Sequence, residues 1–133
     1  EELEREISQG EEEGARRQLE RVMDGYLALA TQQADFCTLY LLLLMEGIGL
    51  NQTLTGEFQK ITRRSREMFV AILDRGKQEG VFRPDLDPFT VAASLLGAID
   101  GLFIQWALDR GAFDLREAFQ GLRDGLARGI EGR

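Results

Sequence analysis

The chain has 133 residues, 44% hydrophobic and 29% charged, which indicates one globular, soluble domain over residues 1–133. Its net charge of -7 disfavours nucleic-acid binding by this chain alone, because Lys and Arg supply most of the affinity for phosphates. Histidine is absent, which excludes Ser-His, Cys-His and zinc-type sites. The single cysteine, Cys37, excludes an internal disulfide and fits a reducing compartment, so we expect a cytoplasmic protein.

Three helices are predicted in the first part of the chain. Residues 1–9 form an acidic helical stretch, and a second, amphipathic helix runs from Glu11 to about Gln32, with its apolar face at Ala15, Leu19, Val22, Tyr26 and Leu29. The acidic run 11–13 fits the first turn of that helix, where the macrodipole favours negative charge, better than a metal site. The third stretch, Ala34 to Glu46, is apolar on all sides but too short to cross a bilayer, so we expect a core helix.

A fourth helix is predicted from about Gly56 to Glu79. Its apolar stripe consists of Phe58, Ile61, Ser65, Met68, Phe69, Ile72 and Leu73. The basic run of residues 63–66 suggests either nucleic-acid binding or a solvated helix face. Because the run lies among glutamates on the polar side of the helix, a solvated face is favoured. Gly80 is expected at the C′ position, and Pro84 prevents the helix from continuing.

A fifth helix should begin at Asp87-Pro88, which combines an N-cap residue with the ring-fixed first helical residue. From Thr90 to Leu108 its strongly polar side chains are Ser94, Asp100 and Gln105. A helix that is apolar nearly all round must be buried on more than one side. The length approaches that of a membrane span, but the charge of Asp100 at its middle disfavours that interpretation.

Small residues form ridges on the last two predicted helices. Ala93, Gly97 and Gly101 recur every four residues on the fifth helix, and Gly121, Gly125 and Gly129 do so on the last, which is capped by Asp114 and ends near Ile130. The ridges either pack against each other within one chain or lie outside its core, in a four-helix dimer interface. The large apolar surface of the fifth helix favours the dimer. The predicted interface residues are Ala93, Gly97, Gly101, Leu115, Phe119, Leu122, Gly125 and Leu126.

The predicted class is therefore all-α, with about six helices in an antiparallel bundle whose last two helices form the dimeric four-helix interface. We find no phosphate-binding glycine motif and no Glu-x-x-His pattern, so no cofactor, no metal and no enzymatic activity are expected. A small helical enzyme is the less favoured alternative. It would need a polar cleft with a strongly perturbed carboxylate.

The segment from Gly80 to Asp109 resembles the C-terminal regulatory domain of TetR-family transcriptional repressors. That family typically shows a Gly-x-Leu/Phe-Arg-x-Asp-x-Asp-Pro turn and then a long helix with an Ala-Ala pair and an Asp-Gly pair. The matching residues here are Gly80, Phe82, Arg83, Asp85, Asp87, Pro88, Ala92, Ala93, Asp100 and Gly101. Tyr26-Leu27, Phe36 and the LLLLME run are also similar, so the resemblance covers most of the chain, although its motifs are degenerate.

The resemblance implies a homodimer that binds a small hydrophobic or amphipathic effector, such as an acyl chain, an acyl-CoA thioester or an aromatic compound. It also implies that DNA is bound only through an N-terminal helix-turn-helix domain absent from this chain, either because that domain was removed or because this is a stand-alone relative. The candidate effector-lining residues are Phe36, Cys37, Tyr40, Leu44, Phe58, Met68, Phe69, Phe103, Gln105 and Trp106. Each of them also fits plain core packing, and a dimerisation module with a filled core and no ligand is the main alternative.

Overall fold

The computed structural model describes residues 14–48 and 52–132, and it contains five helices within those ranges. They are α2 (Ala15–Gln32), α3 (Ala34–Gly47), α4 (Gln52–Glu79), α5 (Pro88–Leu108) and α6 (Leu115–Ile130). The all-α class and the five helices predicted after residue 10 are confirmed. The helix predicted over residues 1–9 and the start predicted at Glu11 lie outside the described residues.

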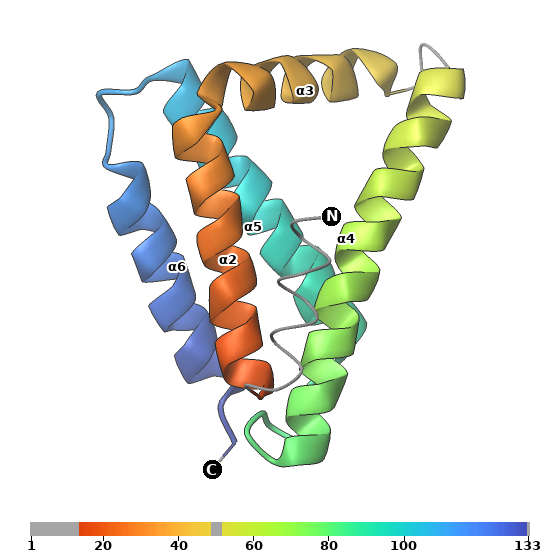
Figure 1. Ribbon diagram of the computed structural model, residues 1–133, viewed down its shortest axis with the longest axis vertical. Helices are drawn as coiled ribbons and strands as arrows, with labels where there is room; N and C mark the ends of the chain where they lie inside the picture. The colour runs from red at the N-terminus through yellow and green to blue at the C-terminus, as the bar shows by residue number, and fades with distance from the viewer. Residues whose placement is uncertain (1–13, 49–51, 133) are drawn as a thin grey trace.

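The helices outline a triangle in projection (Figure 1). α3 spans the top after a bend of 99° from α2, and it reaches towards the start of α4. α4 forms the opposite side, while α5 runs diagonally from the lower part of α4 towards the upper end of α2. α6 packs against α2 and α5. This arrangement places a corner between α3 and α4 at one end of the molecule and a separate two-helix face at α5 and α6.

The core lies where α2, α4, α5 and α6 meet. Its largest fully buried side chains are Phe69, Leu73 and Val22. The Phe69 ring stacks on Tyr26 of α2 with 5.9 Å between the ring centroids. Burying a side chain of this size contributes about 1.5–3 kcal/mol. The prediction that Ala34–Glu46 forms a core helix is wrong, because α3 crosses one end of the molecule and buries only Leu41 among its large apolar side chains, while Phe36, Leu39, Leu42, Leu43 and Met45 are exposed.

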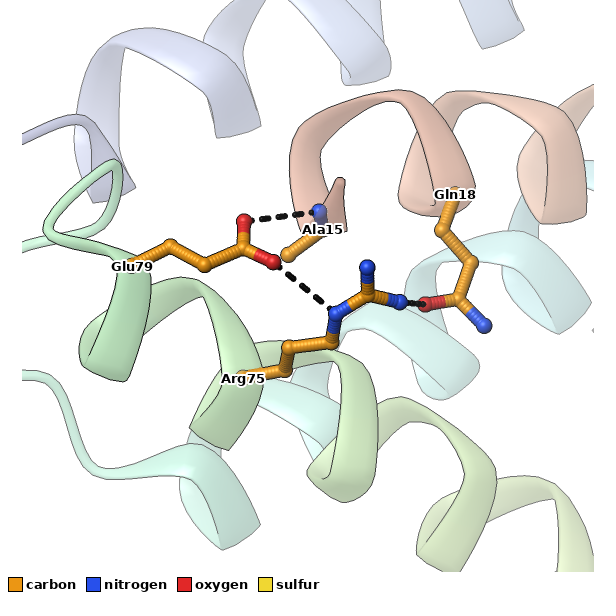
Figure 2. Close-up of polar contacts among 4 residues, drawn as sticks. All are labelled: Ala15, Gln18, Arg75 and Glu79. Carbon is orange, nitrogen blue, oxygen red and sulfur yellow. Dashed lines mark hydrogen bonds and ion pairs between the residues drawn. The ribbon is translucent and has the colours of Figure 1, made fainter. Parts of the chain in front are cut away.

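A polar contact with α4 holds the first turn of α2 (Figure 2). Gly14 precedes α2 and has no side chain to cap it. The Glu79 carboxylate accepts a hydrogen bond from the Ala15 backbone N–H at 3.0 Å and one from Arg75 Nε at 2.9 Å. Arg75 Nη1 also donates to Oε1 of the buried Gln18 at 3.3 Å. Glu79 therefore acts as an N-cap supplied by another helix.

Replacing Glu79 with alanine should lower the free energy of unfolding by about 1 kcal/mol, the usual effect of losing an N-cap. Glu79→Gln keeps an acceptor and should lose less. Glu57→Ala is the control, because Glu57 pairs with Lys60 at the exposed surface of the same helix and should change stability by about 0.5 kcal/mol or less. Urea unfolding measures all three variants, and equal losses for Glu79→Ala and Glu57→Ala would rule out the capping role.

α4 begins at Gln52, before its predicted start near Gly56. The Thr55 hydroxyl donates a hydrogen bond to the Gly47 carbonyl at the end of α3. Contact with α3 therefore extends the helix beyond the part that its apolar stripe predicts.

The turn after α4 is the one expected from the sequence. Gly80 has φ +77°, a left-handed conformation that favours glycine. The Gly80 N–H donates to the Lys77 carbonyl at 3.2 Å, and the Val81 N–H donates to the Gly76 carbonyl at 3.0 Å, which together make a Schellman motif. The loop is then tied to the end of α6, because the Arg83 N–H donates to the Ile130 carbonyl at 2.7 Å.

The two predicted N-caps of the last helices are also present. The Asp87 carboxylate accepts from the Phe89 N–H at 3.1 Å and from the Thr90 hydroxyl at 2.7 Å. The Asp114 carboxylate accepts from the Glu117 N–H at 3.1 Å. Within the described ranges, α5 is long and apolar enough to cross a bilayer. One of its faces, with Leu95, Ile99 and Phe103, is instead buried in the core.

Candidate functional site

A cleft of about 330 Å³ lies between the end of α3 and the first half of α4, and we call it the α3–α4 cleft. Its lining residues are Leu44, Gly47, Ile48, Thr55, Phe58, Gln59, Thr62, Arg63 and Arg66. The volume is at the lower end of the range found for small-molecule pockets. Two of the predicted effector-lining residues, Leu44 and Phe58, are among these. A third, Tyr40, packs against Phe58 edge-on with 5.2 Å between the ring centroids.

A polar cluster lies among the helices around Asp100, which is half-buried on α5. The Tyr26 side chain from α2 forms a hydrogen bond with Ser65 from α4. The Asp100 carboxylate interacts electrostatically with both Tyr26 and Tyr40. Burial raises the pKa of Tyr26 and of Tyr40, and the Asp100 charge adds to both effects. Four helices thus contribute polar groups to one region of an otherwise apolar interior.

Asp100 is the carboxyl group with the most perturbed environment among the described residues. Its burial raises the pKa from 3.8 to about 6. Near neutral pH the carboxylate is therefore largely ionised but poorly solvated, which is a state that a hydrogen-bond donor or a cation would stabilise.

The other predicted lining residues are not brought together in one site. Phe69 has no exposed surface, and Phe103 is also buried. Phe103 packs against the half-buried Trp106 with 5.8 Å between the ring centroids, and the Arg110 guanidinium lies 4.7 Å from the Trp106 ring centroid. Met68 is half-buried against the core. The half-buried Cys37 thiol donates to the Leu29 carbonyl at 3.8 Å, and burial raises its pKa.

Phe36 and Gln105 do not point inward as the sequence suggested. Phe36 is 59% exposed, because it lies on the side of α3 roughly opposite the buried Leu41. Gln105 is exposed for the same reason on α5, where Phe103 marks the buried side. Neither residue lines the α3–α4 cleft.

The sequence interpretation missed the polar part of the α3–α4 cleft. Thr55, Gln59, Thr62 and Arg66 recur at spacings of four, three and four along α4, so they share one side of the helix. That spacing is visible in the sequence, but it could only be assigned to a cleft once α3 was placed beside it. Tyr26 and Ser65 were likewise assigned to apolar stripes and not to a polar cluster.

A second concave surface, the α5–α6 groove, has a volume of about 560 Å³ and is open to solvent. The small residues among its lining are Ser94, Ala98, Gly121, Gly125 and Gly129. A Cβ built on Gly97, Gly101, Gly121, Gly125 or Gly129 meets no atom within 4 Å. The two ridges of small residues therefore do not pack against each other within this chain.

The predicted dimer-interface residues divide into three groups. Leu122, Gly125 and Leu126 line the α5–α6 groove, while Ala93 and Gly97 lie exposed on the outer side of α5 beside the half-exposed Gly101. Leu115 and Phe119 were assigned to the wrong side, because they are 3% and 4% exposed in the single chain and belong to its core. They leave no surface for a second subunit to cover.

Within residues 14–48 and 52–132, no group of three or more Cys, Asp or Glu side chains could hold a metal ion.

Comparison with known proteins identifies the family. The model of the BetI-type transcriptional repressor C-terminal domain matches residues 15–131. Among solved structures, the chain is similar to the crystal structure of a TetR-family transcriptional regulator from Cytophaga hutchinsonii, with a TM-score of 0.63 and 24% sequence identity. That match covers 70% of this chain and 46% of the Cytophaga chain, so this chain spans less than half of that protein. At this identity the likeness shows the fold.

A search of curated proteins found no match. The family match, in contrast, extends over nearly all of the described residues and agrees with the resemblance carried by the Gly80–Asp109 segment. This chain belongs to the family of BetI-type transcriptional repressor C-terminal domains, among the TetR-family regulators.

Proposed function

We propose that this chain is the effector-binding and dimerisation domain of a cytoplasmic transcriptional repressor. It binds a small hydrophobic or amphipathic effector, and it controls DNA binding by a helix-turn-helix domain that lies outside this chain. The observation that carries the proposal is the α5–α6 groove, an open surface of small residues on the two helices that the family would use for pairing.

The groove supports pairing because its shape suits helix packing. Glycine and alanine side chains let helix backbones approach closely, and the groove gives room for the ridge of an identical helix pair. Next to it, the outer side of α5 exposes apolar surface, including Leu108 at 83% exposure. A two-fold axis through this face would bury the same patch on both subunits and remove that surface from water.

α5 is the element through which an effector would act on the dimer. Its outer side carries Gly97, while its inner side carries Asp100 and the buried Phe103. An effector with different affinities for two positions of α5 would shift the dimer between two arrangements. The separation of the two DNA-binding heads would change with it.

The dimer is tested by sedimentation of the purified domain and of two variants, one in the α5–α6 groove and one on the outer side of α5. Gly125→Leu and Gly97→Leu should each weaken dimerisation about tenfold or more, because the new side chain occupies space that the second subunit needs. Gly56→Leu is the matched control, since Gly56 lies on α4 and is also open, with no atom within 4 Å of an added Cβ. A wild-type monomer, or Gly125→Leu and Gly97→Leu proteins that dimerise as well as Gly56→Leu, would contradict the proposal.

A further inference from the structure

The polarity of the α3–α4 cleft changes along its length. Leu44, Ile48 and the buried Phe58 make its apolar end, at the corner where α3 meets α4. Arg63 and Arg66 lie at the other end, five and eight residues beyond Phe58 on the same helix. At 1.5 Å per residue, the two ends are about 8–12 Å apart along the axis of α4.

The two arginines of the cleft differ in their pairing from several other basic residues of this chain. Within the part of the chain that the structure describes, neither Arg63 nor Arg66 forms an ion pair, although the whole chain has a net charge of -7. Arg66 is held against α5 by the Phe89 ring, with its guanidinium 5.4 Å from the ring centroid. A guanidinium stacked on a ring keeps its N–H donors free for another acceptor.

The neighbouring Arg64 differs from these two arginines. It is exposed and does not line the cleft. Arg63 is also exposed, but it and the half-buried Arg66 line the cleft, whereas Arg64 does not. Replacing Arg64 with glutamine removes one positive charge outside the cleft and therefore serves as a control.

We propose that the α3–α4 cleft binds an amphipathic anion, with its carboxylate or phosphate on Arg63 and Arg66 and its apolar chain against Leu44 and Phe58. This inference rests on the proposed effector-binding function and names the chemical class of the effector. Arginine binds planar or tetrahedral oxyanions through paired N–H donors, and Gln59 and Thr62 add neutral donors between the two ends of the cleft. The alkyl chain of the ligand would contact the apolar corner, and this contact would remove apolar surface from water.

The polar cluster at Asp100 would favour a ligand of the opposite charge to the one proposed for the α3–α4 cleft. A ligand held there would be a cation or a neutral hydrogen-bond donor, because Asp100 is a poorly solvated carboxylate beside two phenols. That cluster and the α3–α4 cleft have different lining residues. Ligands with the same alkyl chain and different head groups therefore distinguish the two sites.

The test is isothermal titration calorimetry of the purified domain with decanoate, decyl phosphate, decanol and decyltrimethylammonium below their micelle concentrations. We expect at least one of the two anions to bind tenfold or more tightly than decanol and than the cation. The Arg63→Gln/Arg66→Gln double variant should bind that anion at least tenfold more weakly and leave decanol binding unchanged. Arg64→Gln should bind the anion within about twofold of wild type.

Equal affinity for all four head groups, preference for the cation, or an equal loss in Arg64→Gln would overturn the inference. Sedimentation of the same samples separates this failure from failure of the proposed function. A dimer that binds none of the four probes overturns the anion site alone. A monomer that binds none of them overturns both proposals.

Discussion

Replacing Gly76 with alanine is expected to lower the free energy of unfolding by about 3 kcal/mol, the largest single effect that we predict. Gly76 is buried in α4, and a Cβ there would lie 2.0 Å from Cδ2 and 2.3 Å from Cε2 of the Phe82 ring. Phe82 is 2% exposed. Its N–H donates to the Gly76 carbonyl at 3.1 Å, which fixes the backbone beside the ring. The ring, or the backbone that carries it, therefore has to shift to make room for the methyl group.

The matched control is Gly56→Ala in the same helix. No atom lies within 4 Å of a Cβ at Gly56, so this variant should gain about 0.5–1 kcal/mol from helix propensity. Urea unfolding of both variants under the same conditions gives the comparison. Stability of Gly76→Ala equal to wild type would mean that the Phe82 ring can move without loss, against the packing described here.

Replacing Asp100 with asparagine is expected to raise the free energy of unfolding at about pH 7.5 by about 2 kcal/mol. Burial raises the pKa of this carboxyl from 3.8 to about 6. A rise of this size corresponds to about 3 kcal/mol, and partial contact of the side chain with water reduces that figure. The neutral amide avoids the cost of holding a charge in this position.

The pH dependence follows from the direction of that shift. The folded protein holds the Asp100 proton more tightly than the unfolded chain, so wild-type stability should fall as the pH rises from about 4 to about 6. The gain in Asp100→Asn should therefore be small at about pH 4 and complete at about pH 7.5. Urea unfolding at both pH values measures it, with Asp74→Asn on the exposed side of α4 as control. A gain of the same size at both pH values would exclude the buried charge as its cause.

The helix ends were predictable because local signals determine them. Asp87 and Asp114 cap the helices that follow, and Gly80 ends α4 with φ +77°. Each of these signals acts within a few residues of the chain. The start of α4 at Gln52 lies four residues before the predicted start near Gly56, and in this first turn Thr55 contacts the end of α3.

The buried sides of the amphipathic helices α2, α4 and α6 were largely predictable, but what covers them was not, and for the uniformly apolar α3 the sequence did not show which side is buried. The stripe on α6 contains Leu115, Phe119, Leu122 and Leu126, and its spacing alone does not separate a monomer core from a dimer face. In the structure the first two are core residues, and the last two line the α5–α6 groove. That division depends on how far α6 is rotated against α2 and α5.

The candidate effector site was predicted only in its apolar half. Large side chains such as Leu44 and Phe58 indicated a cavity between the helices, and both line the α3–α4 cleft. Arg63 and Arg66 were assigned only to a solvated helix face, because a pattern of charges on one helix does not reveal the cleft that the helix forms with its neighbour. Asp100 stood out in its apolar setting, but its neighbours Tyr26 and Tyr40 come from other helices.

The central claim is that this domain pairs with itself and encloses a small effector, and native mass spectrometry of the purified domain tests it most directly. One spectrum reports both the number of subunits and any ligand retained through purification. The account predicts a dimer, with part of the population carrying the added mass of an amphipathic molecule that is released on unfolding. A monomer with no bound species would contradict it.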